Sequence, residues 1–317
     1  MNSKNDRRVR AKTALTHPKI SGVLSPPPRP RPPMITTQLI KTAPGMVFDV
    51  SVAGPADGPL VLMLHGFGVS RYLWNAQVEA LARAGYRTAA PNQRGYAAGA
   101  RPDPTDHPAY RIDNLLSDAR AIAAALTQRR FHLVGHDWGA SLAWQIADET
   151  PEQLASLTIL SRPHPLAFNA ALAMPDGEQK RRSGHHTRFL DPQAGLDILA
   201  DDAKWLRTRL QANGVPPEAV ERHLSVIGNP QAMEAALAWY RARGVRHEPV
   251  HPTKVPTLYI WGDNDDTVGR AAAEGTGAYI AAPYRFEVLP GGGHYTPDQF
   301  PERVSALMLD HLTRHPA

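Results

Sequence analysis

Short apolar runs alternate with longer amphipathic stretches along most of this chain. Such an alternation is typical of parallel strands joined by crossover helices. The apolar runs predict strands over residues 46–53, 59–64, 86–90, 131–134, 157–160, 256–261 and 284–289. Helical spacing of apolar residues predicts helices over 74–84, 112–128, 141–149 and 301–313. We therefore expect an α/β fold with a mostly parallel central sheet flanked by helices.

The strand pattern disappears between residues 166 and 252. Only amphipathic stretches with helical spacing remain in this part, over 203–212, 217–227 and 231–243. We expect a core in two parts, 34–165 and 253–317, interrupted by a helical insert at 166–252.

The absence of cysteine among the 317 residues narrows the chemistry. It excludes a disulfide scaffold, a cysteine nucleophile, an iron–sulfur cluster and a thiolate zinc site. No apolar run approaches the ~18 residues that span a bilayer. We therefore expect no membrane partner.

The positive charge gathers at the amino terminus. Residues 1–33 hold eight of the 35 basic residues, one of the 30 acidic residues and seven prolines, which leaves a net charge of −2 for the rest. Such a segment predicts a disordered tail. It lacks the apolar region of an export signal and aromatic residues that would stack on bases. We expect a cytoplasmic protein without a nucleic-acid partner.

Residues 135–139 read Gly-His-Asp-Trp-Gly, between a predicted strand and a predicted helix. The two glycines permit a tight strand-to-helix turn that raises the central side chain above the sheet. Asp137 stands where serine hydrolases carry serine. A carboxylate is ionised at neutral pH and can attack an activated alkyl carbon to form an ester. Asp137 is thus a candidate nucleophile for epoxides or alkyl halides; the alternative is a helix N-cap.

A histidine and an acidic cluster follow the last two predicted strands. His294 comes after three glycines, and its ordinary pKa suits a general base. The residues after the strand at 157–160 offer no carboxylate, so the cluster after 256–261 must orient this histidine. We favour Asp265, with Asp266 second and Asp263 third.

The loop His-Gly-Phe-Gly at residues 65–68 follows the strand at 59–64. Its glycines allow the backbone to approach the turn at Asp137. The backbone N–H groups of Phe67 and Trp138 are therefore the expected donors to the oxyanion formed during ester hydrolysis.

With these motifs, the chain resembles the α/β-hydrolase superfamily and, within it, the epoxide hydrolases, over about residues 36–315. The resemblance rests on the segments 65–68, 93–96, 135–139, 163–165 and 291–294. It implies that the insert is a cap domain and that the reaction needs neither a metal nor an organic cofactor. It also implies an epoxide and water as partners and a vicinal diol as product; a homodimer is compatible with it.

Two cap tyrosines commonly donate hydrogen bonds to the epoxide oxygen in that family. Tyr240, within Ala-Trp-Tyr-Arg, matches the second donor. The first falls in Arg-Ser-Gly-His-His at 182–186, so His185 would replace the tyrosine, with His186 as the alternative.

Two other interpretations compete with this one. A haloalkane dehalogenase would use the same Asp137, Asp265 and His294, and the Trp138 indole would suit a halide, but Phe67 stands where those enzymes usually carry asparagine. A hydrolase fold retained only for binding is the third interpretation. The complete set of nucleophile, acid and base argues against it.

Overall fold

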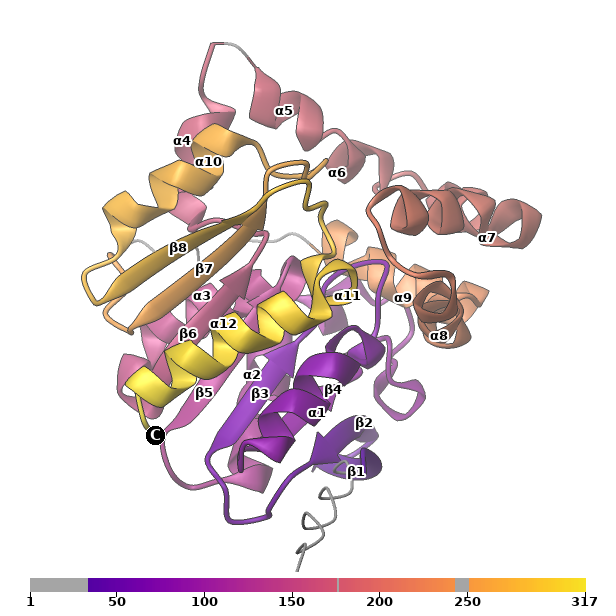
Figure 1. The fold of residues 1–317 in the computed structure, drawn as a ribbon. Helices are drawn as coiled ribbons and strands as arrows, with labels where there is room; N and C mark the ends of the chain where they lie inside the picture. The colour runs from indigo at the N-terminus through magenta and orange to yellow at the C-terminus, as the bar shows by residue number, and fades with distance from the viewer. Residues whose placement is uncertain (1–33, 176, 243–250) are drawn as a thin grey trace, which may run out of the picture. The chain divides into compact units, whose positions relative to one another are not determined.

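The structure is a computed structural model that describes residues 34–175, 177–242 and 251–317. The predicted tail at 1–33 lies outside these residues. A single eight-stranded sheet has the order β1-β2-β4-β3-β5-β6-β7-β8 (Figure 1). Its strands are β1 Thr36–Ala43, β2 Met46–Ala53, β3 Leu60–Leu64, β4 Arg87–Pro91, β5 Phe131–His136, β6 Leu154–Leu160, β7 Thr257–Gly262 and β8 Tyr284–Leu289.

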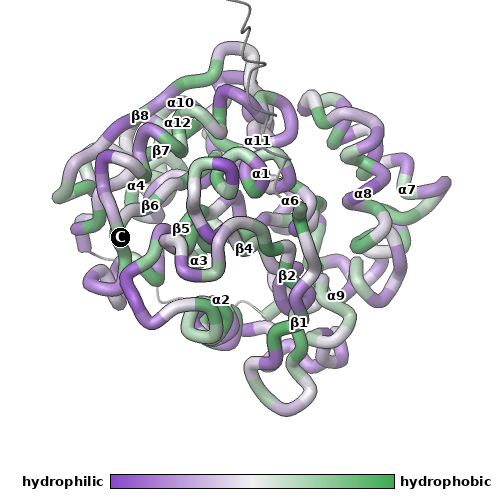
Figure 2. The backbone as a smooth tube through the Cα atoms, turned by 60° about the horizontal axis from the view of Figure 1, so that its bottom comes forward, coloured by the Kyte–Doolittle hydropathy of each residue, from purple (hydrophilic) through white to green (hydrophobic). Residues whose placement is uncertain are grey.

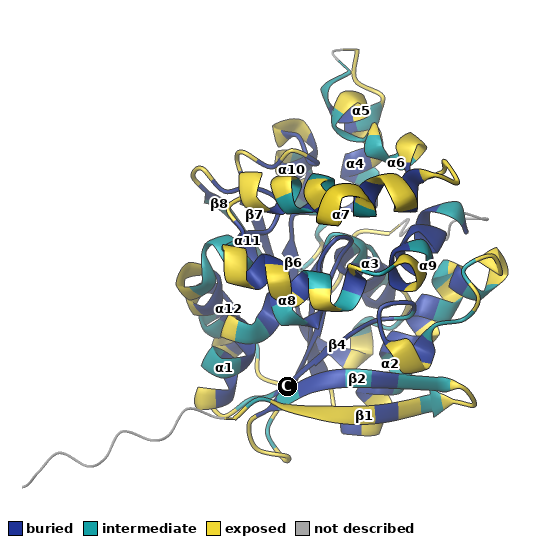
Figure 3. Cartoon of the chain, turned by 90° about the vertical axis from the view of Figure 1, so that its right-hand side faces the viewer, coloured by how far each residue is buried: buried dark blue, intermediate teal, exposed yellow. Residues whose placement is uncertain are grey.

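The strands from β4 to β8 along the sheet run parallel. At one edge β2 pairs antiparallel with β4, and β1 pairs antiparallel with β2. Every residue of β3 is buried, because a parallel strand in mid-sheet has a covered surface on both faces. Most of β1 is exposed, as its yellow colour in Figure 3 shows. This weak apolar pattern explains why the sequence did not predict β1.

Helices cover both faces of the sheet. Helix α1 packs against α12 on one face, and α2 and α3 lie on the other (Figure 1). The core helices are α1 Asn75–Arg83, α2 Ile112–Leu126, α3 Trp138–Glu149, α10 Arg270–Gly275, α11 Thr296–Gln299 and α12 Pro301–Arg314. Short 3₁₀ helices are η1 Arg71–Trp74, η2 Ala98–Ala100, η3 His107–Tyr110, η4 Pro151–Gln153 and η5 Thr276–Tyr279.

The described residues between β6 and β7 contain helices and no strand. These helices are α4 Pro165–Leu172, α5 Glu178–Arg182, α6 His185–Arg188, α7 Ala194–Ala212, α8 Pro217–Ile227 and α9 Pro230–Arg241. We call the described residues between 166 and 252 the helical insert. Hydrophilic and hydrophobic positions alternate along α7 and α8 (Figure 2), as expected for helices with one buried face.

Two details differ from the predicted elements. Helix α7 begins nine residues earlier than predicted and contains non-helical backbone from Ala200 to Ala203, so its second part matches the predicted helix. Helix α3 begins at Trp138 rather than at residue 141, because the chain turns from strand to helix within the single residue Asp137. The α/β-hydrolase fold class itself is confirmed.

Candidate active site

The carboxyl ends of the central strands lie at one edge of the sheet. The register pairs Leu64 of β3 with Gly135 of β5, and His136 of β5 with Leu160 of β6. The loops after these strands therefore leave the sheet together, as parallel strands require.

Asp137 occupies a strained turn between β5 and α3. Its φ of 51° and ψ of −114° are values that residues other than glycine rarely adopt. A Cβ atom on Gly135 would lie 2.5 Å from the carbonyl oxygen of Gly139, and one on Gly139 would lie 2.2 Å from that of Leu64. The two flanking glycines are therefore needed for this turn to form.

The carboxylate of Asp137 meets the loop after β3. The backbone N–H of Phe67 donates to Oδ1 at 2.9 Å. Burial raises the pKa of Asp137, but the charges of His294 and His136 and the N–H groups of Phe67 and Trp138 together hold it below its ordinary value. The carboxylate is thus anionic, and both amides predicted for the oxyanion hole act on it.

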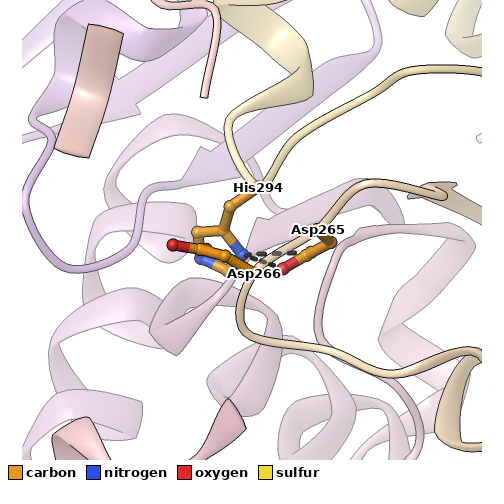
Figure 4. Close-up of side chains that lie close together, drawn as sticks. All are labelled: Asp265, Asp266 and His294. Carbon is orange, nitrogen blue, oxygen red and sulfur yellow. Dashed lines mark hydrogen bonds and ion pairs between the residues drawn. The ribbon is translucent and has the colours of Figure 1, made fainter. Parts of the chain in front are cut away.

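His294 lies between two carboxylates. Its Nε2 is 3.8 Å from Oδ2 of Asp137. Its Nδ1 is 3.1 Å from both oxygens of Asp265 (Figure 4). Burial lowers the pKa of His294, but the charge and hydrogen bond of Asp265, together with the charges of Asp137 and Asp266, raise it above its ordinary value. The structure therefore brings Asp137, Asp265 and His294 together.

The two alternative acids have other partners. Asp266 is exposed, and its Oδ1 pairs with Arg209 at 3.1 Å. Asp263 accepts a hydrogen bond from the backbone N–H of Gly291 at 2.6 Å, which ties two loops together. Of the three candidates, Asp265 is the one hydrogen-bonded to Nδ1 of His294.

Asp265 is held by more than the histidine. Its Oδ1 accepts from the backbone N–H groups of Thr267 at 2.7 Å and Val268 at 3.1 Å, and its Oδ2 accepts from the hydroxyl of Ser161 at 2.7 Å. Burial raises the pKa of Asp265, but His294 and these donors lower it to about 2. The carboxylate stays charged although it is buried.

Ser161 is a neighbour that the sequence did not predict. It follows β6, and we considered this position only for a carboxylate. Its hydroxyl oxygen is 2.8 Å from Nδ1 of His294. One feature of the sequence could have indicated Ser161. It stands directly after a central parallel strand, between the strands that precede Asp137 and Asp265.

Two aromatic residues pack against Tyr240 of α9. Its buried ring lies edge-to-face with Trp138, at 5.2 Å between centroids, and with Phe67 at 5.4 Å. The two residues whose amides we predict for the oxyanion hole therefore also contact the predicted ring-opening tyrosine.

His185 of α6 lies near Tyr240, at 6.4 Å between ring centroids, and its charge interacts with Asp137. Burial, with a smaller effect of Arg209, lowers its pKa to about 4. Its Nδ1 is 3.1 Å from the carbonyl oxygen of Arg182. A carbonyl only accepts, so Nδ1 carries the proton of the neutral ring and Nε2 is an acceptor.

His186 is close to the same rings. Its centroid is 4.3 Å from that of His185 and 5.8 Å from that of Tyr240. Ring distances do not separate the two histidines, so His185 stays the prediction and His186 its alternative.

Side chains of the helical insert also reach the loops of the acid and the base. Oδ1 of Asn213, just after α7, accepts from the backbone N–H of His294 at 2.8 Å. Gln179 of α5 bonds the carbonyl of Thr267 at 2.9 Å and the N–H of Gly269 at 2.9 Å. These residues were also missed, because Asn213 stands at a helix end and Gln179 in a short polar helix, where neither residue type indicates a distant contact.

Among the described residues, Asp265, Asp266 and His294 are the set whose ligand atoms approach one another closely, within 4.8 Å. Protein partners already occupy them: Asp265 accepts the bonds given above, and Asp266 pairs with Arg209. The hydrogen bonds between Asp265 and His294 account for the close approach of these side chains without a metal ion.

The chain belongs to the α/β-hydrolase fold family, whose model, described as alpha/beta hydrolase fold, matches residues 59–301. It is a hydrolase, and its resemblance to epoxide hydrolases is confirmed. None of the described helices is long and apolar enough to cross a membrane.

Individual relatives support this assignment. AB hydrolase superfamily protein YfhM of Bacillus subtilis (strain 168) is 31% identical over 275 residues, covering 84% of this chain and 95% of the relative. Epoxide hydrolase A of Mycobacterium tuberculosis is 28% identical over 320 residues, covering 88% and 97%. A solved structure of novel epoxide hydrolases from metagenomes of hot environments has a TM-score of 0.78 at 27% identity, covering 88% of this chain and 99% of that one.

Proposed function

We propose that this enzyme converts epoxides to vicinal diols through a covalent alkyl ester on Asp137. The observation that carries this proposal is the placement of one carboxylate: Oδ1 accepts the N–H of Phe67, while Oδ2 faces Nε2 of His294. The names of several relatives point to the same substrate class.

In the first step, Oδ2 of Asp137 attacks an epoxide carbon. The new bond is an ester C–O bond, the ring C–O bond breaks, and its electron pair goes to the ring oxygen. The lowered pKa of Asp137 keeps the nucleophile charged at neutral pH. Oδ1 becomes the ester carbonyl oxygen and stays with its backbone donor.

The ring oxygen takes a proton or a hydrogen bond from the insert. Tyr240 is the donor that we favour, because a phenol carries its proton over the whole neutral range. His185 is the second donor, and it acts as an imidazolium, because its neutral ring presents a lone pair at Nε2. Its contribution therefore grows toward its pKa of about 4.

In the second step, Nε2 of His294 removes a proton from water, and the hydroxide adds to Cγ of Asp137. The negative charge appears on Oδ1, where the N–H groups of Phe67 and Trp138 stabilise it. Collapse breaks the bond between Cγ and Oδ2 and releases the diol, whose oxygen takes the proton back from His294. Asp137 is left as a carboxylic acid, and its proton replaces the one that Tyr240 gave to the ring oxygen, so both groups return to their starting state. Asp265 stabilises the transient imidazolium.

The surrounding side chains favour apolar epoxides. Phe189 packs against Phe67 at 4.7 Å and against Tyr240 at 4.9 Å between centroids, and Trp138 packs against Trp239 at 5.7 Å. Aromatic rings around a charged nucleophile exclude water and accept hydrophobic substituents.

Trapping the ester tests the proposal. We expect a His294→Gln variant to gain the mass of one epoxide, with the adduct on the peptide that contains Asp137. The matched control, Asp137→Asn in the same background, should gain no mass. An unlabelled His294→Gln protein across a broad panel of aliphatic and aromatic epoxides would refute the mechanism.

Isotope labelling adds a second readout. In a single turnover in ¹⁸O-water, the label should enter the carboxylate of Asp137 rather than the diol, because water attacks Cγ. Halide release from chloro- or bromoalkanes at a higher rate than diol formation would favour a haloalkane dehalogenase instead.

A further inference from the structure

We propose that Ser161 is a positioning residue that aligns Asp265 and His294 for hydrolysis of the ester. This inference rests on the proposed function, since it concerns the second of the two steps. It assigns a role to a hydroxyl that touches neither the nucleophile nor the expected substrate.

The hydroxyl of Ser161 lies between the acid and the base. It is 2.7 Å from Oδ2 of Asp265 and 2.8 Å from Nδ1 of His294. Ser161 is buried, with 1% of its surface exposed, so water does not compete for these contacts. Hydrogen bonds to a charged group in such an environment are stronger than those at a surface.

Counting protons fixes the direction of each bond. The carboxylate of Asp265 has no proton, so the single hydroxyl proton of Ser161 is donated to Oδ2. Nδ1 of His294 must then be the donor to the three oxygens around it, one from Ser161 and two from Asp265. This arrangement leaves the lone pair on Nε2, which faces Asp137 and the expected water.

The backbone of Ser161 is held in a conformation that needs support. Its φ of 66° belongs to the left-handed region, where a side chain costs free energy and glycine does not. The hydroxyl of Tyr259 donates to the carbonyl of Ser161 at 2.7 Å. The backbone N–H of Ser161 donates to the carbonyl of Ile260 at 3.0 Å. These bonds aim the side chain at Asp265 rather than away from the sheet.

Two substitutions separate the hydroxyl from the strain. Ser161→Gly removes both, whereas Ser161→Ala removes the hydroxyl and keeps the strain. We expect both variants to form the Asp137 adduct at the wild-type rate and to hydrolyse it roughly 10-fold to 100-fold more slowly, the range for one hydrogen bond to a charged group. Rapid-quench mass spectrometry measures both rates, and thermal unfolding should show Ser161→Gly to be the more stable variant.

Wild-type hydrolysis of the adduct by Ser161→Gly would overturn the inference. A loss in Ser161→Ala alone would also overturn it, because that pattern reports strain and not the hydroxyl. If no epoxide labels the His294→Gln protein, the proposed function fails, and a second readout still tests Ser161. The proton on Nδ1 of His294, assigned by its absence from His294→Gln, should change its NMR shift in Ser161→Gly; an unchanged shift would count against the role.

Discussion

Replacement of Asp265 by asparagine changes the charge beside His294 and keeps the size of the side chain. The hydrogen bonds fix how the amide would lie. Its oxygen must stay on the side of Thr267 and Val268, whose backbone N–H groups need an acceptor. Its NH₂ group then points at Ser161 and at Nδ1 of His294. Nδ1 becomes an acceptor, so the ring proton moves to Nε2, and the base is lost.

The size of the effect follows from the buried carboxylate. The pKa of Asp265 falls from 3.8 to about 2, with His294 as the largest stabilising partner. This difference corresponds to about 2 kcal/mol. Before His294 can act as a base in the variant, its ring proton must move from Nε2 back to Nδ1, which breaks the new hydrogen bond. This step adds about 1.5–3 kcal/mol to the barrier, the value of a hydrogen bond to a charged group. We therefore expect hydrolysis of the ester to slow roughly 10³-fold, close to the loss known for this exchange in other triads.

Burst kinetics test this expectation. Asp265→Asn should form one equivalent of the Asp137 adduct and then stop, with an unfolding temperature near that of the wild type. Asp266→Asn is the matched control, one residue away and exposed, and it should change turnover only slightly. Normal turnover in Asp265→Asn, or a complete block in Asp266→Asn, would refute the assignment of the acid.

Other predictions concern the ring-opening groups, the base and the turn. Tyr240→Phe should slow adduct formation about 100-fold near neutral pH. His185→Gln should have a smaller effect at neutral pH and a larger one toward about pH 4. Single-turnover labelling measures both effects. Because the pKa of His294 is raised, hydrolysis should fall as the pH drops through a value above the ordinary 6.5, while adduct formation continues; a pH profile of both steps checks this. Gly66→Ala should impair adduct formation, since its Cβ would lie 2.4 Å from that of Asp137, and crystallography would reveal the displaced loop.

The sequence predicted most of the fold because its signals are local. Strands β2 and β8 and helix α8 have the predicted boundaries, since each carries a continuous apolar or amphipathic pattern between turn residues. The Gly-rich segments around Asp137 and before His294 are likewise local, and each follows a strand at the edge where active sites form. Strand β1 and helix α10 were missed because their residues are exposed or small.

Side chains that act across the fold carry no such signal. The hydroxyl of Ser161 meets His294 133 residues further along the chain, and the pairing of β6 with β7 and of β7 with β8 brings their loops together. Asn213 shows the same difficulty in a sharper form. It ends α7, where asparagine is common for local reasons, yet its side chain accepts the N–H of His294. A distant contact is therefore not predictable where a local role already explains the residue. The proposed hydrolysis of the ester depends on two such contacts, because His294 is held by Ser161 of the core and by Asn213 of the helical insert.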